Sequence, residues 1–253
     1  TKRAVAPELP PRLEQVLWVE LTPEQADLYR RMEQEGERQL LDLAAAGAAE
    51  SSLRLAALTQ LLRLRQICCD PRLVATLPEQ PTAAVSAKLE ACRELLAEAV
   101  DDGHRLLVFS QFTSFLALVK TRLDEAGVRY EYLDGRTRDR GARVARFQSA
   151  EGAPVFLISL KAGGHGLNLT AAEYVYLLDP WWNPAVEAQA IDRAHRIGQL
   201  RHVLATRVVA RDTIESKILE LQASKRALAD AILGEDKGGL GAIGRAELEL
   251  LFG

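Results

Sequence analysis

The chain has 253 residues, 48% of them hydrophobic and 26% charged, and its 32 basic and 35 acidic side chains give a formal net charge of −3. This composition excludes an intrinsically disordered or collagen-like chain, and no stretch approaches the ~18 consecutive apolar residues of a membrane span, so no membrane partner is expected. The acidic balance excludes a uniformly basic nucleic-acid coat but not a local basic groove. Three cysteines lack a Cys-x-x-Cys spacing, which predicts neither a disulfide framework nor a zinc site.

Residues 1–81 are predicted to form a mainly helical segment. Apolar alternation over 16–20 is compatible with a short strand. Thr22 followed by Pro23 is a typical helix start, and Gly36 is expected to interrupt or weaken that helix.

A second helix is predicted over 52–67, ending before Asp70-Pro71 because a residue that precedes proline disfavours helix. Its apolar side is predicted to consist of Leu55, Leu58, Leu62 and Ile67. Residues 77–85, with two prolines, are the best candidate for a linker.

Residues 82–232 alternate between helical and strand patterns, which predicts an α/β fold with a parallel sheet sandwiched by helices. The apolar run 105–109 is typical of a strand buried on both faces. The next helix carries an apolar stripe, namely Phe112, Phe115, Leu116, Val119 and Leu123. The remaining predicted elements are strands at 128–133, 154–159, 174–179 and 202–209 and helices at 86–100, 139–149, 184–193 and 213–233. Residues 233–253 are predicted to be a flexible tail with a short helix.

Residues 136–146 form an arginine-rich stretch. Its five arginines, Arg136, Arg138, Arg140, Arg143 and Arg146, face only Asp139 within the segment. A solvated helix face and a contact with an anionic partner are both compatible with this pattern.

Residues 157–172 run from a predicted strand into Lys161 and a glycine-rich loop. Glycines let the backbone approach a phosphate closely, and exposed amides in such a loop can bind an anion. A structural turn explains the glycines as well, and a Rossmann fingerprint fails because Asn168 stands near the place of its third glycine. A P-loop is excluded because the chain contains no Gly-Lys dipeptide.

Residues 176–199 are the most specific stretch. Trp181 and Trp182 are adjacent in a polar loop. Tryptophans in such a loop more often cover a hydrophobic core than insert into nucleic acid. Beyond them, Gln189, Arg193 and Arg196 are spaced to share one face of a helix. Two guanidiniums with few nearby acids suit a polyanionic ligand better than a salt-bridge ladder, although carboxylates from elsewhere, including Asp192, could pair with them.

These motifs together resemble the Swi/Snf-type ATPases of helicase superfamily two, and residues 86–232 resemble the second RecA-like motor lobe. LVFSQFTS resembles motif IV, YLDGRT the adjoining turn, ISLKAGGHGLNL motif V, DPWWNP the tryptophan-bearing motif and QAIDRAHRIGQ motif VI. LPPRLEQVLWVELTPEQADLY and LRLRQICCDPRLV resemble the segments that join the two lobes.

The resemblance implies that ATP with Mg²⁺ binds between two lobes and that an N-terminal lobe, absent from this chain, supplies the P-loop. It makes Arg193 and Arg196 candidate arginine fingers. The implied nucleotide contacts are Gly164, Gly166, Asn168 and Gln189. The implied contacts to double-stranded DNA are Ser110, Gln111, Lys161 and Trp182, while Trp181 keeps a packing role.

The function expected from this resemblance is that of one lobe of an ATP-driven translocase on double-stranded DNA, resembling chromatin remodellers or associated with RNA polymerase or a nucleoprotein. Without the first lobe, the chain alone is expected to show negligible ATPase activity. The alternative is a non-catalytic module that docks nucleic acid or protein. DPWWNP and RIGQ disfavour an RNA helicase. The expected compartment is the cytoplasm, at the nucleoid, of a bacterium, or the nucleus of a eukaryote.

Overall fold

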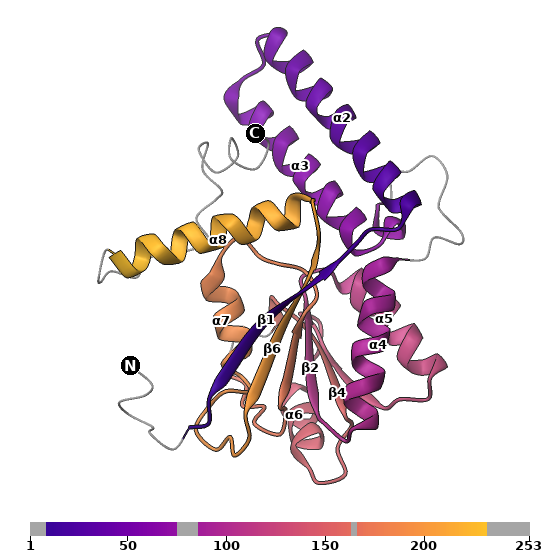
Figure 1. The fold of residues 1–253 in the computed structure, drawn as a ribbon, viewed down its shortest axis with the longest axis vertical. Coiled ribbons are helices and arrows are strands. Elements are labelled where there is room, and N and C mark those ends of the chain that lie inside the picture. Colours follow the sequence, from indigo (N-terminus) through magenta and orange to yellow (C-terminus); the bar gives the residue numbers. More distant parts are fainter. Residues whose placement is uncertain (1–8, 75–85, 163–165, 232–253) are drawn as a thin grey trace. The chain divides into compact units, whose positions relative to one another are not determined.

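The computed structural model describes residues 9–74, 86–162 and 166–231 (Figure 1). Predictions for the linker at 77–85, the tail at 233–253 and Gly164 lie outside these ranges. The chain divides into two compact units. The sheet unit comprises residues 1–18 and 89–209, and the helical unit comprises residues 19–88 and 210–253. The predicted domain boundary at residue 81 stays a prediction; in this division the first strand of the chain belongs to the sheet unit.

The described residues form one six-stranded parallel sheet with the order β1-β6-β5-β2-β4-β3. Its strands are β1 (Arg12–Val19), β2 (Leu106–Ser110), β3 (Tyr130–Leu133), β4 (Val155–Ser159), β5 (Tyr174–Leu177) and β6 (Val203–Ala210). The predicted α/β fold is therefore confirmed.

The centre of the sheet is formed by strands with no exposed side chain. Every residue of β2 and of β4 is buried, and the two strands pair in register from Leu106 opposite Val155 to Ser110 opposite Ser159. Continuous apolar runs of this kind are what a parallel strand needs when helices cover both faces.

Four helices belong wholly or mainly to the sheet unit, namely α4 (Ala87–Asp101), α5 (Thr113–Glu125), α6 (Arg140–Gln148) and α7 (Pro184–Ile191). Phe147 of α6 and Ile191 of α7 join one apolar core with Phe109 and Phe156 of the central strands. The stripe predicted for α5 is confirmed, since all five of its apolar residues are buried. Helices α4 and α5 lie next to each other (Figure 1).

The helical unit contains α2 (Pro23–Ala45), α3 (Glu50–Cys69), a short 3-10 helix η1 (Pro71–Leu73) and α8 (Ile214–Ala231). Thr22 caps α2 as predicted, because its hydroxyl accepts a hydrogen bond from the Gln25 amide at 3.2 Å. Helix α2 is continuous through Gly36, so the predicted interruption is wrong. The glycine is instead a contact point with the Gln60 side chain of α3.

Helix α3 ends at Cys69, before Asp70, as predicted. Its predicted apolar side is wrong, however, because Leu55 is 67% exposed and Leu62 is 45% exposed. Apolar residues occur all around this helix, so spacing alone does not identify the buried face. The residues that are buried are Ala57, Gln60, Leu61, Leu64, Arg65, Ile67, Cys68 and Cys69. Within the described ranges, no helix is long and apolar enough to cross a membrane.

Candidate functional site

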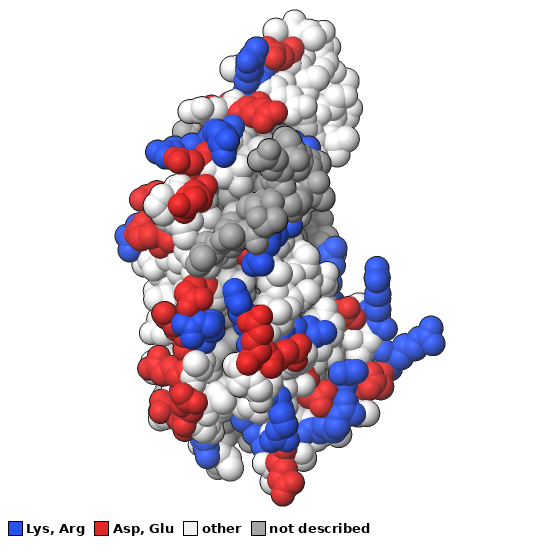
Figure 2. All heavy atoms as spheres, turned by 90° about the vertical axis from the view of Figure 1, so that its right-hand side faces the viewer, with Lys and Arg blue, Asp and Glu red and all other residues white. Residues whose placement is uncertain are grey.

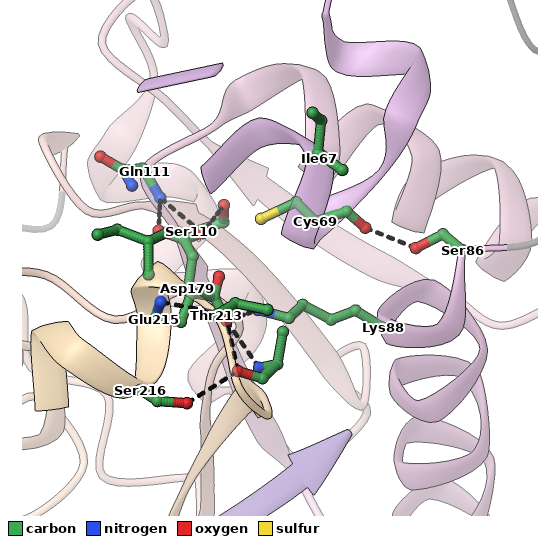
Figure 3. A network of polar contacts seen from close by, with 12 residues as sticks. Ile67, Cys69, Ser86, Lys88, Ser110, Gln111, Asp179, Thr213, Glu215 and Ser216 are labelled. Carbon is green, nitrogen blue, oxygen red and sulfur yellow. Dashed lines mark hydrogen bonds and ion pairs between the residues drawn. The ribbon is translucent and has the colours of Figure 1, made fainter. Parts of the chain in front are cut away.

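The loops that follow β2 and β5 are joined by a buried carboxylate. Asp179, two residues beyond the end of β5, is fully buried and accepts a hydrogen bond from the Ser110 hydroxyl at the end of β2 (Figure 3). The backbone N–H of Gln111 also donates to Asp179, at 3.2 Å from Oδ1 and 3.3 Å from Oδ2. The side chain of Ser110, which is expected to contact DNA, is buried in this structure and orients the loop through its bond to Asp179.

Three of the residues expected to contact DNA follow the carboxyl ends of adjacent strands. Gln111 follows β2, Lys161 follows β4 and Trp182 follows β5, and β2 lies between β5 and β4 in the sheet. The carboxyl ends of parallel strands meet at one edge, where α/β proteins bind their ligands. Lys161 is exposed, and the Gln111 Nε2 is buried without a hydrogen-bond partner among the described residues. Among the described residues, this edge therefore carries the exposed cation of Lys161 and, below the surface, the unsatisfied amide donor of Gln111.

The two tryptophans stack on each other between β5 and α7. Their ring centroids are 3.9 Å apart and their planes are inclined by 28°, and both side chains are half-buried. Asn183 caps α7 by accepting a hydrogen bond from the Ala185 amide at 3.0 Å, and Pro184 occupies the first turn. The Trp181 amide donates to the buried Glu187 of α7 at 2.8 Å. The tryptophan loop is therefore fixed to the start of the helix.

Helix α7 ends at Ile191, so the prediction that one helix face carries Gln189, Arg193 and Arg196 is wrong. The Arg193 carbonyl accepts a hydrogen bond from the Leu169 amide at 2.9 Å, a tertiary contact that replaces continuation of the helix. The Gln199 side chain then donates to the carbonyls of Thr170, Ala172 and Ala194. These contacts hold the segment after α7 against the loop that precedes β5.

Arg193 and Arg196 nevertheless lie within electrostatic reach of each other. Arg193 is 9% exposed and its Nε has no hydrogen-bond partner among the described residues, whereas Arg196 is exposed. Burial, and next the charge of Arg196, lower the pKa of the Arg193 guanidinium. Neither arginine forms an ion pair with a described residue. Two close positive charges without a paired carboxylate suit an anionic ligand such as a phosphate.

The other described residues expected at a nucleotide are accessible. Gln189, Gly166 and Asn168 are exposed. Gly166 has φ +56°, in the left-handed region that favours glycine, and a Cβ there would meet no atom within 4 Å. This geometry fits a turn and leaves open space beside the backbone.

Comparison with known proteins identifies the domain. Residues 87–198 match the helicase conserved C-terminal domain. The whole chain is 38% identical to an uncharacterized ATP-dependent helicase of Mycoplasma pneumoniae and covers 24% of it. It is also 38% identical to the putative ATP-dependent helicase/translocase YwqA of Bacillus subtilis and covers 27% of it. Among solved structures, the C-terminal domain of the Sulfolobus solfataricus SWI2/SNF2 ATPase is 27% identical with a TM-score of 0.71, covering 95% of this chain and 97% of that one.

The chain belongs to the Swi2/Snf2 family. It spans about a quarter of the length of the curated relatives, at 24% and 27%. A second solved structure, the Sulfolobus solfataricus SWI2/SNF2 ATPase core in complex with dsDNA, is 27% identical with a TM-score of 0.72, covering 95% of this chain and 50% of that one.

The arginine-rich stretch of this Swi2/Snf2 domain has a structural partner that sequence reasoning missed. Glu131 of β3, which is 9% exposed, accepts from Arg146 Nε at 2.7 Å and lies 3.4 Å from Arg143 Nη1. Arg143 also contacts Asp139. The stretch therefore faces more than Asp139, and two of its five arginines pair with carboxylates.

Sequence reasoning also missed the two carboxylates that organise the tryptophan loop, Asp179 and Glu187. The available signals were an acid directly after a buried strand and an acid in the first turn of the next helix. Both are fully buried, and buried carboxylates require partners. Asp179 pairs with Ser110 of β2 and Glu187 with Arg207 of β6. These partners are distant in the sequence, so sequence patterns do not reveal them.

Proposed function

We propose that this Swi2/Snf2 domain is the second motor lobe of an ATP-dependent translocase on double-stranded DNA. In this proposal, Arg193 and Arg196 contact the phosphates of ATP that a P-loop lobe binds. The carboxyl edge of the sheet, with Gln111, Lys161 and Trp182, contacts the duplex.

The observation that carries the proposal is the arginine pair. A buried guanidinium with an unpartnered Nε, next to a second positive charge, costs free energy unless an anion neutralises it. An arginine finger of this kind stabilises the charge that develops during phosphoryl transfer and contributes roughly 10³–10⁵ to the rate.

The residues present fit the phosphates of a nucleotide. Arg193 and Arg196 can donate to phosphate oxygens, the open space at Gly166 allows close approach of the backbone, and Gln189 is exposed for contact with the nucleotide. When bound, ATP supplies the phosphoryl group whose transfer drives the motor, and Mg²⁺ neutralises its charge. The described residues contain no group of three or more His, Cys, Asp and Glu suited to a metal ion.

The DNA contacts are supported by the geometry of the sheet edge. Lys161 is exposed after β4, Gln111 with its unsatisfied side-chain amide follows the neighbouring strand β2, and Trp182 is held on a loop that Asp179 and Glu187 anchor from both sides. Ser110 takes a positioning role in place of direct contact, since its hydroxyl donates to Asp179.

The test uses a protein that carries this chain together with a P-loop lobe, assayed for ATP hydrolysis with and without duplex DNA. Arg193→Ala and Arg196→Ala are each expected to reduce the DNA-stimulated kcat by roughly 10³-fold or more, in line with the loss of an arginine finger. The matched control is Arg201→Ala, because Arg201 is an exposed arginine on the same segment that pairs with Glu173. It is expected to leave kcat within about twofold, as loss of an exposed ion pair does.

Two outcomes would contradict the proposal. Unchanged hydrolysis in both arginine variants would remove the finger assignment. DNA binding by the two-lobe protein without any hydrolysis would instead support a non-catalytic docking module.

A further inference from the structure

Strand β1 contacts the arginine-bearing segment that follows α7. The His195 Nε2 donates to the Pro10 carbonyl, just before β1, at 2.7 Å. Arg12, the first residue of β1, donates to Asp192 Oδ1 at 3.2 Å. Both contacts lie within the sheet unit and flank Arg193 in the sequence. The edge strand of the sheet therefore contacts one residue before Arg193 and one residue that lies between Arg193 and Arg196.

The same strand is connected to the other end of α7 through buried charges. Glu14 Oε2 lies 2.8 Å from Arg207 Nη2 of β6, and Arg207 Nε donates to Glu187 Oε2 of α7 at 2.7 Å. Arg207 and Glu187 are almost fully buried. Burial alone would raise the pKa of Glu14, but the hydrogen bond and charge of Arg207 bring it below its ordinary value. Glu14 is therefore ionised at neutral pH and completes the chain of charges.

Asp192 is the acid best placed to neutralise Arg193. It is the preceding residue, and its charge acts to raise the pKa of the Arg193 guanidinium against the lowering effects of burial and Arg196. The carboxylate is nevertheless bonded to Arg12, and Arg193 has no ion pair with a described residue. Arg12 also donates to Glu14, which holds its guanidinium beside β1.

We propose that strand β1 positions Arg193 for phosphate contact. Arg12 holds the Asp192 carboxylate away from the Arg193 guanidinium, which is then left for an anionic ligand. Glu14, through Arg207, fixes the first turn of α7 and therefore the position of that helix within the sheet unit. Arg12 and Glu14 are positioning residues in this inference, which rests on the function proposed above.

The decisive variant is Arg12→Gln in the two-lobe protein. It removes the contact of Arg12 with Asp192, whose carboxylate can then turn toward Arg193, so the DNA-stimulated kcat is expected to fall about tenfold. The KM for ATP is expected to change by less than about twofold, because the arginine acts on the transition state.

Rescue separates this role from a merely structural one. In the double variant Arg12→Gln/Asp192→Asn, no free carboxylate remains, and kcat is expected to recover to within about twofold to threefold of wild type, since coupled residues are not additive. If the Asp192 carboxylate did not compete for Arg193 in the Arg12→Gln variant, the added Asp192→Asn substitution would not restore kcat. A double variant as slow as Arg12→Gln alone would overturn the inference, and so would full activity of Arg12→Gln.

The second arm has a matched control on the same strand. Glu14→Gln is expected to lower kcat by several-fold, whereas Glu20→Gln, which removes an exposed partner of Arg211 just after β1, is expected to leave it unchanged. Thermal melting of each variant shows whether the fold is retained, and Arg12→Lys, which keeps the charge, is expected to retain most of the activity. If Glu14→Gln and Glu20→Gln behave alike, Glu14 has no positioning role.

Failure of this inference is distinguishable from failure of the proposed function. If Arg193→Ala leaves hydrolysis intact, the arginine finger itself is wrong. If Arg193→Ala abolishes hydrolysis while Arg12→Gln has no effect, only the role of β1 is overturned.

Discussion

Buried charged residues are the positions at which we expect substitution to be most costly to the stability of this domain. Lys88, at the start of α4, and Glu215, at the start of α8, form an ion pair within the helical unit, and both side chains are fully buried (Figure 3). Glu215 Oε2 also accepts from the Ala210 amide at 2.8 Å, while its Oε1 has no partner among the described residues. Burial alone would lower the pKa of Lys88, but the charge and hydrogen bond of Glu215 and the nearby Cys68 and Cys69 together raise that pKa.

Removing the cation of this pair should therefore be costly. Lys88→Met leaves a buried carboxylate without a counter-ion, and we expect a loss of ~3–5 kcal/mol in the free energy of unfolding, measured by urea denaturation. Adding Glu215→Gln should recover part of the loss, since the amide oxygen can still accept from Ala210. The control is Arg30→Met, which breaks the exposed pair with Asp27 and should cost under ~1 kcal/mol. Equal losses in Lys88→Met and Arg30→Met would contradict the prediction.

Among the elements, the α2–α3 hairpin depends on close approach at one glycine. A Cβ on Gly36 would lie 2.1 Å from Gln60 Nε2, and that amide donates to the Met32 carbonyl. Gln60 is itself only 4% exposed. A larger residue at position 36 must therefore displace a buried amide from its partner.

This predicts that Gly36→Ala destabilises the domain although alanine favours helix. The helix gains up to ~1 kcal/mol from the substitution, but displacing the buried amide costs ~1–3 kcal/mol, and packing is lost in addition. In a Gln60→Ala background, the same substitution should be stabilising. The control is Gly141→Ala in α6, where no atom lies within 4 Å of the new Cβ and only the propensity gain applies. Thermal melting of the four variants tests the sign, and a stabilising Gly36→Ala in the wild-type background would refute it.

The sheet unit was predictable because its elements carry local signals. The apolar run at 105–109 became β2 and the stripe beginning at Phe112 became the buried side of α5. These patterns arise from burial on defined faces, which the sequence records directly.

Two features of the site and hairpin were not predictable in this way. Helix α7 ends at Ile191 because tertiary hydrogen bonds, such as that from the Leu169 amide to the Arg193 carbonyl, compete with further helix. In α3, Leu55 is exposed because the partner helix selects a face that periodicity does not mark. Both depend on neighbours that are distant in the sequence.

At the scale of the whole molecule, net charge does not describe how the chain could bind DNA. The formal net charge is −3, and acidic and basic side chains are interspersed over the face drawn in Figure 2. Electrostatic attraction to a duplex must therefore come from individually placed cations. Among the residues proposed to contact DNA, Lys161 is the one that carries a positive charge.

This placement predicts how salt should affect DNA binding by the 253-residue chain. Each phosphate contact contributes about −0.9 to the slope of log affinity against log salt concentration, so Lys161→Ala should make the slope less negative by about 1. Gln111→Ala removes a neutral donor and should weaken binding at every salt concentration without changing the slope. The matched lysine control is Lys120→Ala, because Lys120 lies 5.0 Å from the centroid of the Tyr132 ring and has no proposed phosphate contact. Fluorescence anisotropy with a labelled duplex measures all three. If Lys120→Ala and Lys161→Ala change the slope equally, binding is diffuse over the surface and the sheet edge is not the DNA site.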